Sequence, residues 1–534
     1  MYKMKNKKII FFCLLVLISG FLRFYKLSEY PIQLNHDEIS QAYDTASIVK
    51  TGKDIYGNYL PLVFPSTGDY KVGHYIYLST FPYKVFGNQE FTIRVASAFF
   101  GTLTIIAIFL FVIAFTKNFW LAFSSAFLVT FTPSEIFYSR KSFENVIGVT
   151  LVFFGLYCLF RDLNEEKNNL LKCLGIFLMS SAMYVYTSHT IVVPLLLLFY
   201  AISIRNQIIR EYKKYILLLL FWIFLISPLI INSFLNSDLR FRAASVFVTQ
   251  NIDLGRQLNL SQNNFKTYMD FIFIRYLNQF NPVYLFSNGL NLTNQGFIGL
   301  GPLLLIQLPL VLLGFIFIIR KSNFSAEKRF FFFGLLGLPI IPSVITFEPF
   351  SPHRSMLEFT VLSVISGFGL YWLVQKRNIL INILIFSCIS FNLIFFLNMY
   401  TVGYPFEKSQ EIHYPFKNVV LYAISQQNNF DKIIIDPTYG EIAPVYGVAM
   451  HYYLAYYGNF SPETLQRELQ ITKEGMVFKK FHIRKINWRV DQDLKNILFI
   501  GSEWSLPLKD IDKSRIINKF NFYNGQVAFY AIKL

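Results

Sequence analysis

Long apolar runs alternate with short polar segments along the first three quarters of the chain. A helix that crosses the hydrocarbon core of a bilayer needs about 20 apolar residues, and eleven runs approach that length. They lie near residues 9–27, 92–116, 118–136, 144–160, 172–188, 189–204, 215–232, 297–319, 330–347, 356–374 and 379–398. The pattern predicts a polytopic α-helical membrane protein with about 11 transmembrane helices.

The first run follows four lysines, Lys3, Lys5, Lys7 and Lys8. A basic start before an apolar stretch is also typical of a secretory signal peptide. The small residues of a cleavage site do not follow this run, whereas ten further apolar runs do. We therefore interpret the first run as a retained transmembrane helix.

Composition agrees with membrane insertion and explains the basic residues. Only 15% of the residues are charged, against about 25% in soluble proteins. The formal net charge of +17 would suggest a nucleic-acid partner in a soluble protein. Here +13 of that charge falls on every second segment between the apolar runs, namely the N-terminus and the residues around 117, 161–172, 205–214, 320–329 and 376–377. The excess is a topology signal, and no nucleic-acid partner is implied.

Basic segments of membrane proteins stay on the cytoplasmic side. The charge pattern therefore predicts a multi-pass protein of the cell (plasma or inner) membrane with a cytoplasmic N-terminus. Three regions are then extracytoplasmic, namely a first loop at 28–91, a second large loop at 233–296 and the tail at 405–534. We expect two domains, a transmembrane domain over 1–404 and an extracytoplasmic domain over 405–534.

The tail has the pattern of a small α/β domain. Residues 432–436 and 496–500 are short strand-like runs, and residues 444–457 form an aromatic helical stretch. Ser461 followed by Pro462 suits a helix start, because Ser is a good N-cap and Pro fits the first helical position. Asn524-Gly525 between two strand-like runs is a strong hairpin signal.

The first outer loop is the most polar part of the predicted membrane domain. It contains Asn35-His36-Asp37-Glu38 and, further on, Lys71. Two adjacent carboxylates beyond a membrane helix could be ordinary solvated loop charge. They could also supply a general base, because partial desolvation raises the pKa of a carboxyl group and lets it take a proton from a hydroxyl.

Other charged side chains fall at the predicted outer ends of helices. Arg140 and Glu144 lie four residues apart, and a structural ion pair is the simplest interpretation if one helix carries both. His353 and Arg354 lie in a short outer loop, where Arg354 could snorkel to the lipid headgroups. Charged side chains at a membrane cost free energy, so a set of them on one face indicates a functional role. Such a set suits an anionic lipid headgroup and a hydroxyl acceptor.

Metal binding has little support in the spacing of ligands. Asp69 and His74 are weak candidates, and the sequence has neither a His-x-x-x-His nor a His-Glu-x-x-His pattern. The sequence assigns no cofactor with certainty and leaves a divalent metal open.

Four segments together resemble GT-C membrane glycosyltransferases. The nearest groups are the protein O-mannosyltransferases, including bacterial proteins like the dolichyl-phosphate-mannose-protein mannosyltransferases, and the bacterial aminoarabinose transferases of lipid A. The resemblance rests on Arg23-Phe24, Leu27, Pro31 and Asp37-Glu38, on residues 73–105 with Phe86-Gly87, Glu90 and Arg94, on Tyr138-Ser139-Arg140 with Glu144, and on residues 450–461. It is good from residue 20 to about 200 and patchy afterwards.

The resemblance implies a GT-C catalytic domain over 1–404 that transfers a single sugar, of hexosyl or pentosyl type, from a polyprenyl-phosphate donor to a hydroxyl acceptor. The transfer would occur on the extracytoplasmic face with inversion at the anomeric carbon. Asp37 matches the family's catalytic acid, Glu144 its second functional carboxylate, and Lys71 the lysine near the donor phosphate. We expect the catalytic groups to be Asp37, Glu38 and Glu144, and the donor-phosphate contacts to be Lys71, Arg140, His353 and Arg354.

The chain departs from its resemblance groups in two places. Tyr70 stands where the aminoarabinose transferases have a metal-ligand glutamate, with Asp69 beside it, so zinc is not implied. The tail is too short, and lacks the repeats, for the β-trefoil of eukaryotic protein mannosyltransferases. The acceptor therefore stays open between a lipid, a glycan and a protein.

Three other functions fit parts of the pattern. A transporter of lipid-linked glycans needs many helices, but it usually carries charged or broken helices at the membrane midplane, and here the helix centres are uncharged. A polysaccharide polymerase or ligase shares the architecture and uses a diphosphate-linked glycan. A receptor that displays the tail would not need eleven helices.

Overall fold

The computed structural model describes residues 6–66, 70–162, 169–235, 244, 246–288, 299–320, 324–348, 350–439 and 449–534. The chain divides into two compact units. The first consists of Met1–Tyr25 and Ser97–Met399, and the second of Lys26–Ala96 and Tyr400–Leu534. Residues of the segment 28–91 and of the tail 405–534 thus belong to the same compact unit. The sequence-based division into 1–404 and 405–534 stays a prediction.

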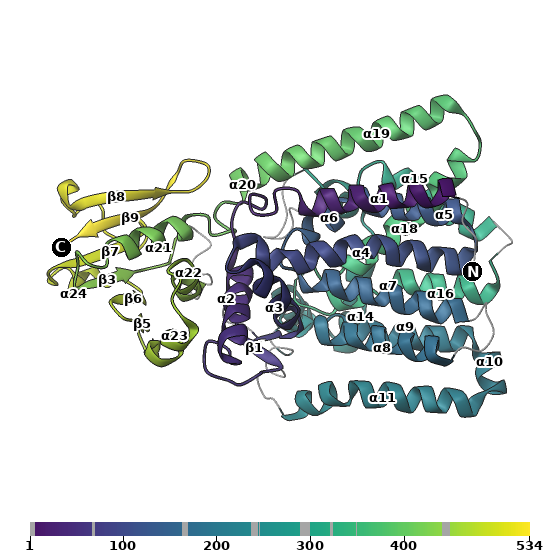
Figure 1. The fold of residues 1–534 in the computed structure, drawn as a ribbon, viewed down its shortest axis with the longest axis horizontal. Helices are drawn as coiled ribbons and strands as arrows, with labels where there is room; N and C mark the ends of the chain where they lie inside the picture. The colour runs from purple at the N-terminus through teal and green to yellow at the C-terminus, as the bar shows by residue number, and fades with distance from the viewer. Residues whose placement is uncertain are drawn as a thin grey trace. The chain divides into compact units, whose positions relative to one another are not determined.

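The first unit is helical (Figure 1). Its longer helices are α1 (Asn6–Phe24), α4 (Glu90–Thr116, which begins in the second unit), α5 (Phe119–Phe131), α7 (Glu144–Asp162), α8 (Asn169–Val185), α9 (His189–Ser203), α11 (Tyr212–Leu235), α14 (Asn264–Asn278), α15 (Gln307–Arg320), α16 (Ala326–Gly337), α18 (Met356–Val374) and α19 (Ile379–Asn398). Shorter helical elements are α6 (Pro133–Ser139), α10 (Arg205–Arg210), η1 (Val248–Gln250), α13 (Ile252–Leu260), η2 (Tyr284–Asn288) and α17 (Ile341–Val344).

A helix overlaps each of the eleven apolar runs. Among the described residues, five helices are long and apolar enough to cross a membrane, within Thr92–Thr116, Glu144–Arg161, Tyr212–Asn232, Met356–Val374 and Ile379–Glu407. Four further apolar helices are shorter, namely Phe119–Phe131, Asn169–Val185, His189–Ser203 and Gln307–Arg320. Pro133 ends the run at 118–136 by starting the separate helix α6, since its ring removes one backbone donor and blocks the preceding turn. The multi-pass helical architecture agrees with the prediction, and the number of crossings stays a prediction.

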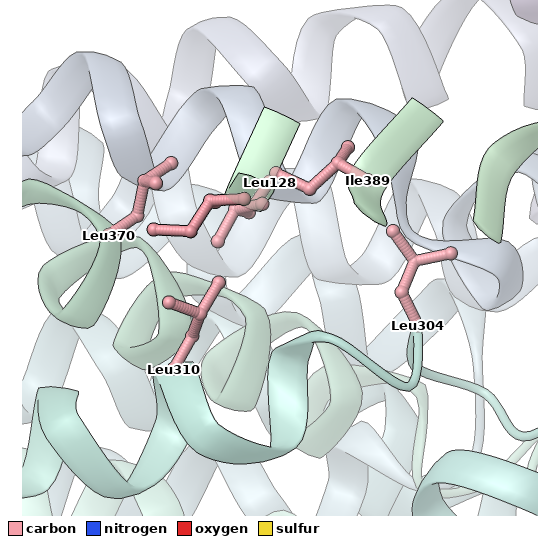
Figure 2. Packing of buried hydrophobic residues seen from close by; sticks show 6 residues of the cluster. Leu128, Leu304, Leu310, Leu370 and Ile389 are labelled. Atoms are coloured by element: carbon pink, nitrogen blue, oxygen red, sulfur yellow. The ribbon is translucent and has the colours of Figure 1, made fainter. Parts of the chain in front are cut away.

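Helices α15 and α18 pack together with little space between their backbones. A Cβ added at Gly314 would collide with the carbonyl oxygen of Ile365, and one at Gly369 with the carbonyl oxygen of Leu310. Small residues allow this close approach, which drives helix association in lipid. Beside this contact lies a cluster of buried apolar side chains from α5, α15 and its preceding turn, α18 and α19, comprising Leu128, Leu304, Leu310, Leu370, Ile385 and Ile389 (Figure 2).

The second unit combines helices with two sheets. Its helical elements are α2 (His36–Thr51), α3 (His74–Phe86), η4 (Met399–Gly403, which begins in the first unit), α20 (Tyr404–Glu407), α21 (Pro415–Ser425), α22 (Met450–Tyr457), α23 (Pro462–Glu468), α24 (Trp488–Asp491) and η6 (Lys513–Arg515). Its strands are β1 (Val63–Pro65), β2 (Tyr70–Val72), β3 (Lys432–Ile435), β4 (Gln470–Ile471), β5 (Gly475–Phe478), β6 (Phe481–Arg484), β7 (Ile497–Gly501), β8 (Ile516–Asn521) and β9 (Val527–Lys533).

The tail is built around a mixed sheet of seven described strands in the order β4-β5-β6-β3-β7-β9-β8. Strand β3 lies in its middle, parallel to both β6 and β7, and is an apolar run buried on both faces. Strands β8 and β9 form the predicted antiparallel hairpin, in which Gly525 takes a φ of +87° that suits glycine. Ser461 caps α23 by accepting a hydrogen bond from the amide of Thr464, as predicted. Of the predicted aromatic helix at 444–457, residues 444–448 lie outside the described residues, and Met450–Tyr457 form α22.

Helix α2 is the central element of the second unit. It packs against α3 from the segment 28–91 and against α22 and α23 from the tail. The hydroxyl of Tyr453 in α22 donates to the carbonyl of Leu34 just before α2 (2.7 Å), and that of Tyr43 in α2 donates to the carbonyl of Phe460 (2.9 Å). These contacts join segments about 400 residues apart in sequence, so the tail directly supports the loop that carries Asp37.

Candidate functional site

The first turn of α2 carries the two adjacent carboxylates. Asn35 caps the helix, since its side chain accepts hydrogen bonds from the amides of Asp37 and Glu38, and the Glu38 carboxylate accepts one from the backbone amide of Asn35. This capping box satisfies amides that a helix start otherwise leaves without partners. Because Asp37 and Glu38 are successive residues of a fixed helix, their side chains leave α2 in different directions.

Asp37 forms an ion pair with Lys71. The Lys71 Nζ lies 2.7 Å from Asp37 Oδ1, and the side chains are 13% and 38% exposed, respectively. Nζ also lies 3.3 Å from the Ser40 hydroxyl, one turn along α2, and 3.4 Å from the Asp37 carbonyl oxygen. Lys71 is held there by β2, which pairs with β1. The structure thus places the predicted catalytic acid and the predicted phosphate-binding lysine in direct contact.

Two histidines lie beside Asp37. His36 Nε2 is 3.5 Å from Asp37 Oδ2, and the His36 ring meets the ring of His413 from the tail edge-on at 5.1 Å. His413 is fully buried, and its carbonyl accepts a hydrogen bond from Gln33 at 2.7 Å. Burial, and then the neighbouring His36, lower the pKa of His413 well below its usual range. His413 therefore adds no positive charge near Asp37 at neutral pH.

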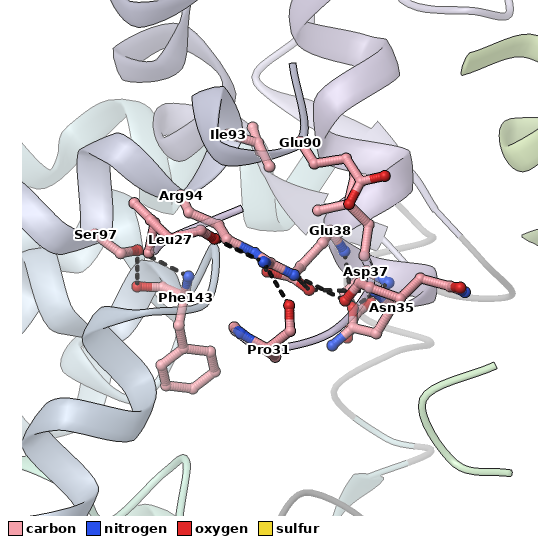
Figure 3. A network of polar contacts seen from close by, with 12 residues as sticks. Leu27, Pro31, Asn35, Asp37, Glu38, Glu90, Ile93, Arg94, Ser97 and Phe143 are labelled. Carbon is pink, nitrogen blue, oxygen red and sulfur yellow. Dashed lines mark hydrogen bonds and ion pairs between the residues drawn. The ribbon is translucent and has the colours of Figure 1, made fainter. Parts of the chain in front are cut away.

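Glu38 has a different environment from that of Asp37. Its carboxylate receives two hydrogen bonds from Arg94, at 2.8 and 3.1 Å, and both side chains are buried. The other Arg94 hydrogens go to the carbonyls of Leu27, Pro31 and Gln33, so one guanidinium fixes the segment before α2 (Figure 3). With both its oxygens bonded, Glu38 serves as an anchor for Arg94 and for the start of α2.

A second carboxylate lies on the Asp37 side of α2. Asp44 follows Asp37 by seven residues, two helical turns, and is buried. Burial, and then the neighbouring carboxylate of Asp54, raise the pKa of Asp44 well above its usual range. Asp54 is satisfied by the amides of Tyr56 and Asn58 at 2.9 Å. Asp44 is thus a buried acid near the pair of Asp37 and Lys71.

The first unit holds the remaining predicted basic residues. Arg140 follows α6 directly, and its terminal nitrogens donate to the carbonyls of Leu22 (2.8 Å) and Tyr25 (2.7 Å). Glu144 begins α7, a separate helix. The two residues therefore do not share one helix, so the condition for a shared helix face is not met, and Arg140 holds the end of α1.

Arg354 and His353 lie in the turn before α18. Arg354 Nη1 is 3.1 Å from a Glu348 carboxylate oxygen and 3.0 Å from the Ser351 hydroxyl. The same hydroxyl lies 3.1 Å from His353 Nε2, and the His353 carbonyl accepts a hydrogen bond from Asn145 beside Glu144 (2.6 Å). The structure thus joins the starts of α7 and α18. Arg354 keeps 17% of its side chain exposed.

The structure describes one of the two weak metal candidates. Asp69 lies outside the described residues, and His74 is the first residue of α3. Within the described residues no group of three His, Cys, Asp or Glu side chains could hold a metal ion. The described residues therefore define no metal site.

Sequence reasoning missed Ser40 and His413. Ser40 could have been found from the helical spacing, because it lies three residues after Asp37 on a helix signalled by the Asn35-x-x-Glu38 capping pattern. His413 had no signal, since nothing in the sequence ties it to a histidine 377 residues earlier.

Comparisons with known proteins address the fold. A family model described as dolichyl-phosphate-mannose-protein mannosyltransferase matches residues 74–231. No curated protein sequence matches the chain significantly.

Solved structures match over much more of the chain. ArnT from Cupriavidus metallidurans bound to undecaprenyl phosphate has a TM-score of 0.60 at 10% identity and covers 99% of this chain and 98% of its own. The oligosaccharyltransferase AglB from Archaeoglobus fulgidus, in complex with an inhibitory peptide and a dolichol-phosphate, has a TM-score of 0.51 at 11% identity, covering 85% and 64%. The A. fulgidus oligosaccharyltransferase tethered to an acceptor peptide also scores 0.51, at 12% identity, covering 98% and 74%. The chain thus has the helical GT-C fold that the sequence resemblance predicts.

Proposed function

We propose that this protein transfers a single sugar from a polyprenyl-phosphate donor to a hydroxyl acceptor, with inversion at the anomeric carbon. The observation that carries the proposal is the contact of 2.7 Å between Asp37 and Lys71 at the start of α2. It brings together a carboxylate that can act as a base and a cation that can bind a phosphate. The lipid phosphates in the ArnT and AglB structures, and the dolichyl-phosphate mannose in the family description, support a lipid-phosphate donor.

Asp37 is the general base of the proposed reaction. Its carboxylate takes the proton of the acceptor hydroxyl, whose oxygen forms a bond to the anomeric carbon. The bond between that carbon and the phosphate oxygen breaks, and polyprenyl phosphate leaves with the electron pair. Attack on the side opposite the phosphate inverts the anomeric configuration. Asp37 suits this role better than Glu38, because it is 38% exposed whereas Glu38 is buried against Arg94.

Lys71 couples donor binding to the activation of Asp37 as the general base. In the structure its ammonium group is paired with Asp37 Oδ1 at 2.7 Å. A donor phosphate offers Lys71 a second anionic partner. When Nζ turns to that phosphate, Lys71 offsets the charge on the leaving group, and Asp37 Oδ1 becomes free to accept the proton. The base is thus activated only when the donor is present.

The first unit contributes further proposed phosphate contacts. Arg354 is the strongest of these candidates, because its side chain is partly exposed. Its hydrogen bonds to Glu348 and Ser351 use Nη1, which leaves other guanidinium N–H groups to bind an anion. His353 beside it is a second. Arg140 is bound to two backbone carbonyls, so we assign it to holding α1. Glu144 stays proposed as the second functional carboxylate.

The proposed topology places this chemistry outside the cell membrane. The basic segments put the N-terminus in the cytoplasm and put residues 28–91, 233–296 and 405–534 outside. Residues 405–534 then form the extracytoplasmic part that supports α2 and helps to choose the acceptor. The sugar is of hexosyl or pentosyl type.

The proposed function is tested in liposomes that contain the full-length protein and a panel of undecaprenyl-phosphate sugars, with a lipid extract of the producing cells as the acceptor source. We expect one donor to be consumed and its sugar to appear on a new product with the opposite anomeric configuration by NMR. Donor that is merely moved to the other leaflet would indicate a transporter. A product with retained configuration, or growth of a glycan chain from a diphosphate-linked substrate, would also contradict the proposal.

A further inference from the structure

A buried hydroxyl group on α2, that of Ser40, connects this helix to the paired strands β1 and β2. Ser40 is 1% exposed and lies about one helical turn after Asp37. Its hydroxyl donates to the Asp37 carbonyl oxygen at 2.9 Å and lies 3.2 Å from the Ser66 hydroxyl and 3.3 Å from Lys71 Nζ. Ser66 follows β1 directly, and Lys71 belongs to β2. The side chain of Ser40 thus joins the start of α2 to both strands.

The contacts of Ser40 use its whole hydrogen-bonding capacity. A hydroxyl group has one hydrogen and two lone pairs. The hydrogen of Ser40 goes to the Asp37 carbonyl, so its oxygen accepts from Lys71 Nζ and from the Ser66 hydroxyl. The hydroxyl cannot rotate without losing one of these bonds. Ser40 therefore presents an acceptor to Lys71 in a fixed position.

Each hydrogen of the Lys71 ammonium group has an acceptor. A lysine side chain carries three such hydrogens, and Nζ lies 2.7 Å from Asp37 Oδ1, 3.4 Å from the Asp37 carbonyl oxygen and 3.3 Å from the Ser40 hydroxyl. Of these three acceptors the carboxylate alone is charged, and it belongs to a side chain that is 38% exposed, whereas Ser40 is buried. An incoming phosphate can therefore replace the carboxylate at Nζ but does not reach Ser40.

We infer that Ser40 is a positioning residue, which holds Lys71 against α2 while the bond from Nζ to Asp37 Oδ1 is exchanged for a bond to the donor phosphate. This inference rests on the proposed function, in which Lys71 binds that phosphate. With Ser40 and the Asp37 carbonyl as two fixed acceptors, Nζ keeps its place and only one of its hydrogens changes partner. Without the Ser40 hydroxyl, the phosphate itself has to order the long lysine side chain, which costs conformational entropy and weakens binding.

Binding of undecaprenyl phosphate measures this effect without a sugar, an acceptor or turnover. The detergent-solubilised full chain is titrated with the lipid, and native mass spectrometry gives the fraction of protein that carries it. We expect Ser40→Ala to raise the Kd for undecaprenyl phosphate about 10-fold, the usual effect of losing one hydrogen bond to a charged group. The unfolding temperature of each variant is measured alongside, so that a loss of binding is separated from a loss of fold.

Two further variants test whether the effect passes through Lys71. Ser47→Ala is the matched control, because it makes the same change at another buried serine of α2, whose hydroxyl bonds the Lys53 carbonyl at 2.6 Å and the Gln466 amide at 3.1 Å. It should leave the Kd unchanged. Ser40→Ala added to Lys71→Met should raise the Kd no further than Lys71→Met alone, because residues that act through one another are not additive.

Three results would overturn the inference and leave the proposed function in place. An equal Kd in Ser40→Ala and the natural protein would show that Lys71 does not need the hydroxyl. A similar rise of the Kd in Ser47→Ala would indicate a general effect on α2. A further rise when Ser40→Ala is added to Lys71→Met would show that Ser40 acts independently of Lys71. If the natural protein did not bind undecaprenyl phosphate at all, the proposed function would fail, and this inference with it.

Discussion

Lys71 Nζ lies 2.7 Å from Asp37 Oδ1, and the two side chains come from a strand and a helix that are 34 residues apart in the chain. The capping box of Asn35 and Glu38 fixes the helix, and the pairing of β1 with β2 fixes the strand. Neither side chain is fully buried. The pair is therefore held in place but remains open to a substrate that competes for either partner.

Replacement of Lys71 should affect the donor more than the acceptor. Lys71→Met removes the cation and keeps most of the side-chain length. We expect kcat/KM for the polyprenyl-phosphate donor to fall by about 100-fold, the usual cost of losing one group that stabilises developing charge. Lys71→Arg keeps the charge and should recover part of the rate. Initial rates at varied donor concentration test this, and unchanged donor kinetics in Lys71→Met would remove Lys71 from the mechanism.

The neighbouring pair of Glu38 and Arg94 should matter for stability. Glu38→Ala leaves a buried guanidinium without its carboxylate, a change that typically costs about 3–5 kcal/mol. We expect a clearly lower unfolding temperature of the detergent-solubilised protein. The matched Asp37→Asn variant should unfold close to the natural protein, because Asp37 is partly exposed. Equal unfolding temperatures for Glu38→Ala and Asp37→Asn would show that the two carboxylates do not differ in the way the structure indicates.

Because of Asp44, the free energy of unfolding should fall as the pH rises. Its pKa in the folded protein lies well above its usual range through burial and the nearby Asp54, whereas the unfolded chain ionises near pH 4. Between those two values the folded state keeps a proton that the unfolded state has lost, so rising pH favours unfolding. Asp44→Asn removes this effect.

Thermal unfolding at several pH values checks the Asp44 prediction. At pH 4 the natural protein and Asp44→Asn should unfold at similar temperatures, and at pH 7 the variant should be the more stable of the two. A difference in unfolding temperature between the natural protein and Asp44→Asn that does not change with pH, or that grows as the pH falls, would contradict a raised pKa for Asp44.

The contact of α15 with α18 should not accept a larger residue. Gly369→Ala places a Cβ against the carbonyl oxygen of Leu310, and two packed helix backbones cannot move apart without losing contacts along their length. We expect less folded protein by size-exclusion chromatography with a fluorescent tag. Gly255→Ala on α13 is the control, because a Cβ there meets no atom within 4 Å. Equal yields of the two variants would contradict the close approach.

The sequence predicts most of the helices and only part of the site. Apolar runs report helices in lipid directly, and errors arise where proline divides a run, as at Pro133. The sequence also predicts β3, β7 and the hairpin of β8 and β9 in the tail, but not β4, β5 and β6. It does not predict the packing of the tail against α2. Tyr453 and Leu34 are 419 residues apart, and no local pattern records such a contact.

The different roles of Asp37 and Glu38 illustrate the same limit. Adjacent carboxylates look alike in a sequence, and both were candidate catalytic groups. On a helix they leave in different directions, so one reaches Lys71 and the other reaches Arg94. The two carboxylates differ in burial, because the fold brings different segments to each side of α2.

The most direct test of the account is the rate of sugar transfer by Asp37→Asn in liposomes supplied with the donor that the natural protein consumes. Asp253→Asn, at an exposed position on α13, is the matched control. We predict that Asp37→Asn folds normally, binds donor and transfers sugar at least 1,000-fold more slowly, the upper part of the ~100- to 10,000-fold range for general base catalysis, while Asp253→Asn keeps the natural rate. Transfer by a normally expressed Asp37→Asn protein at close to the natural rate would contradict it.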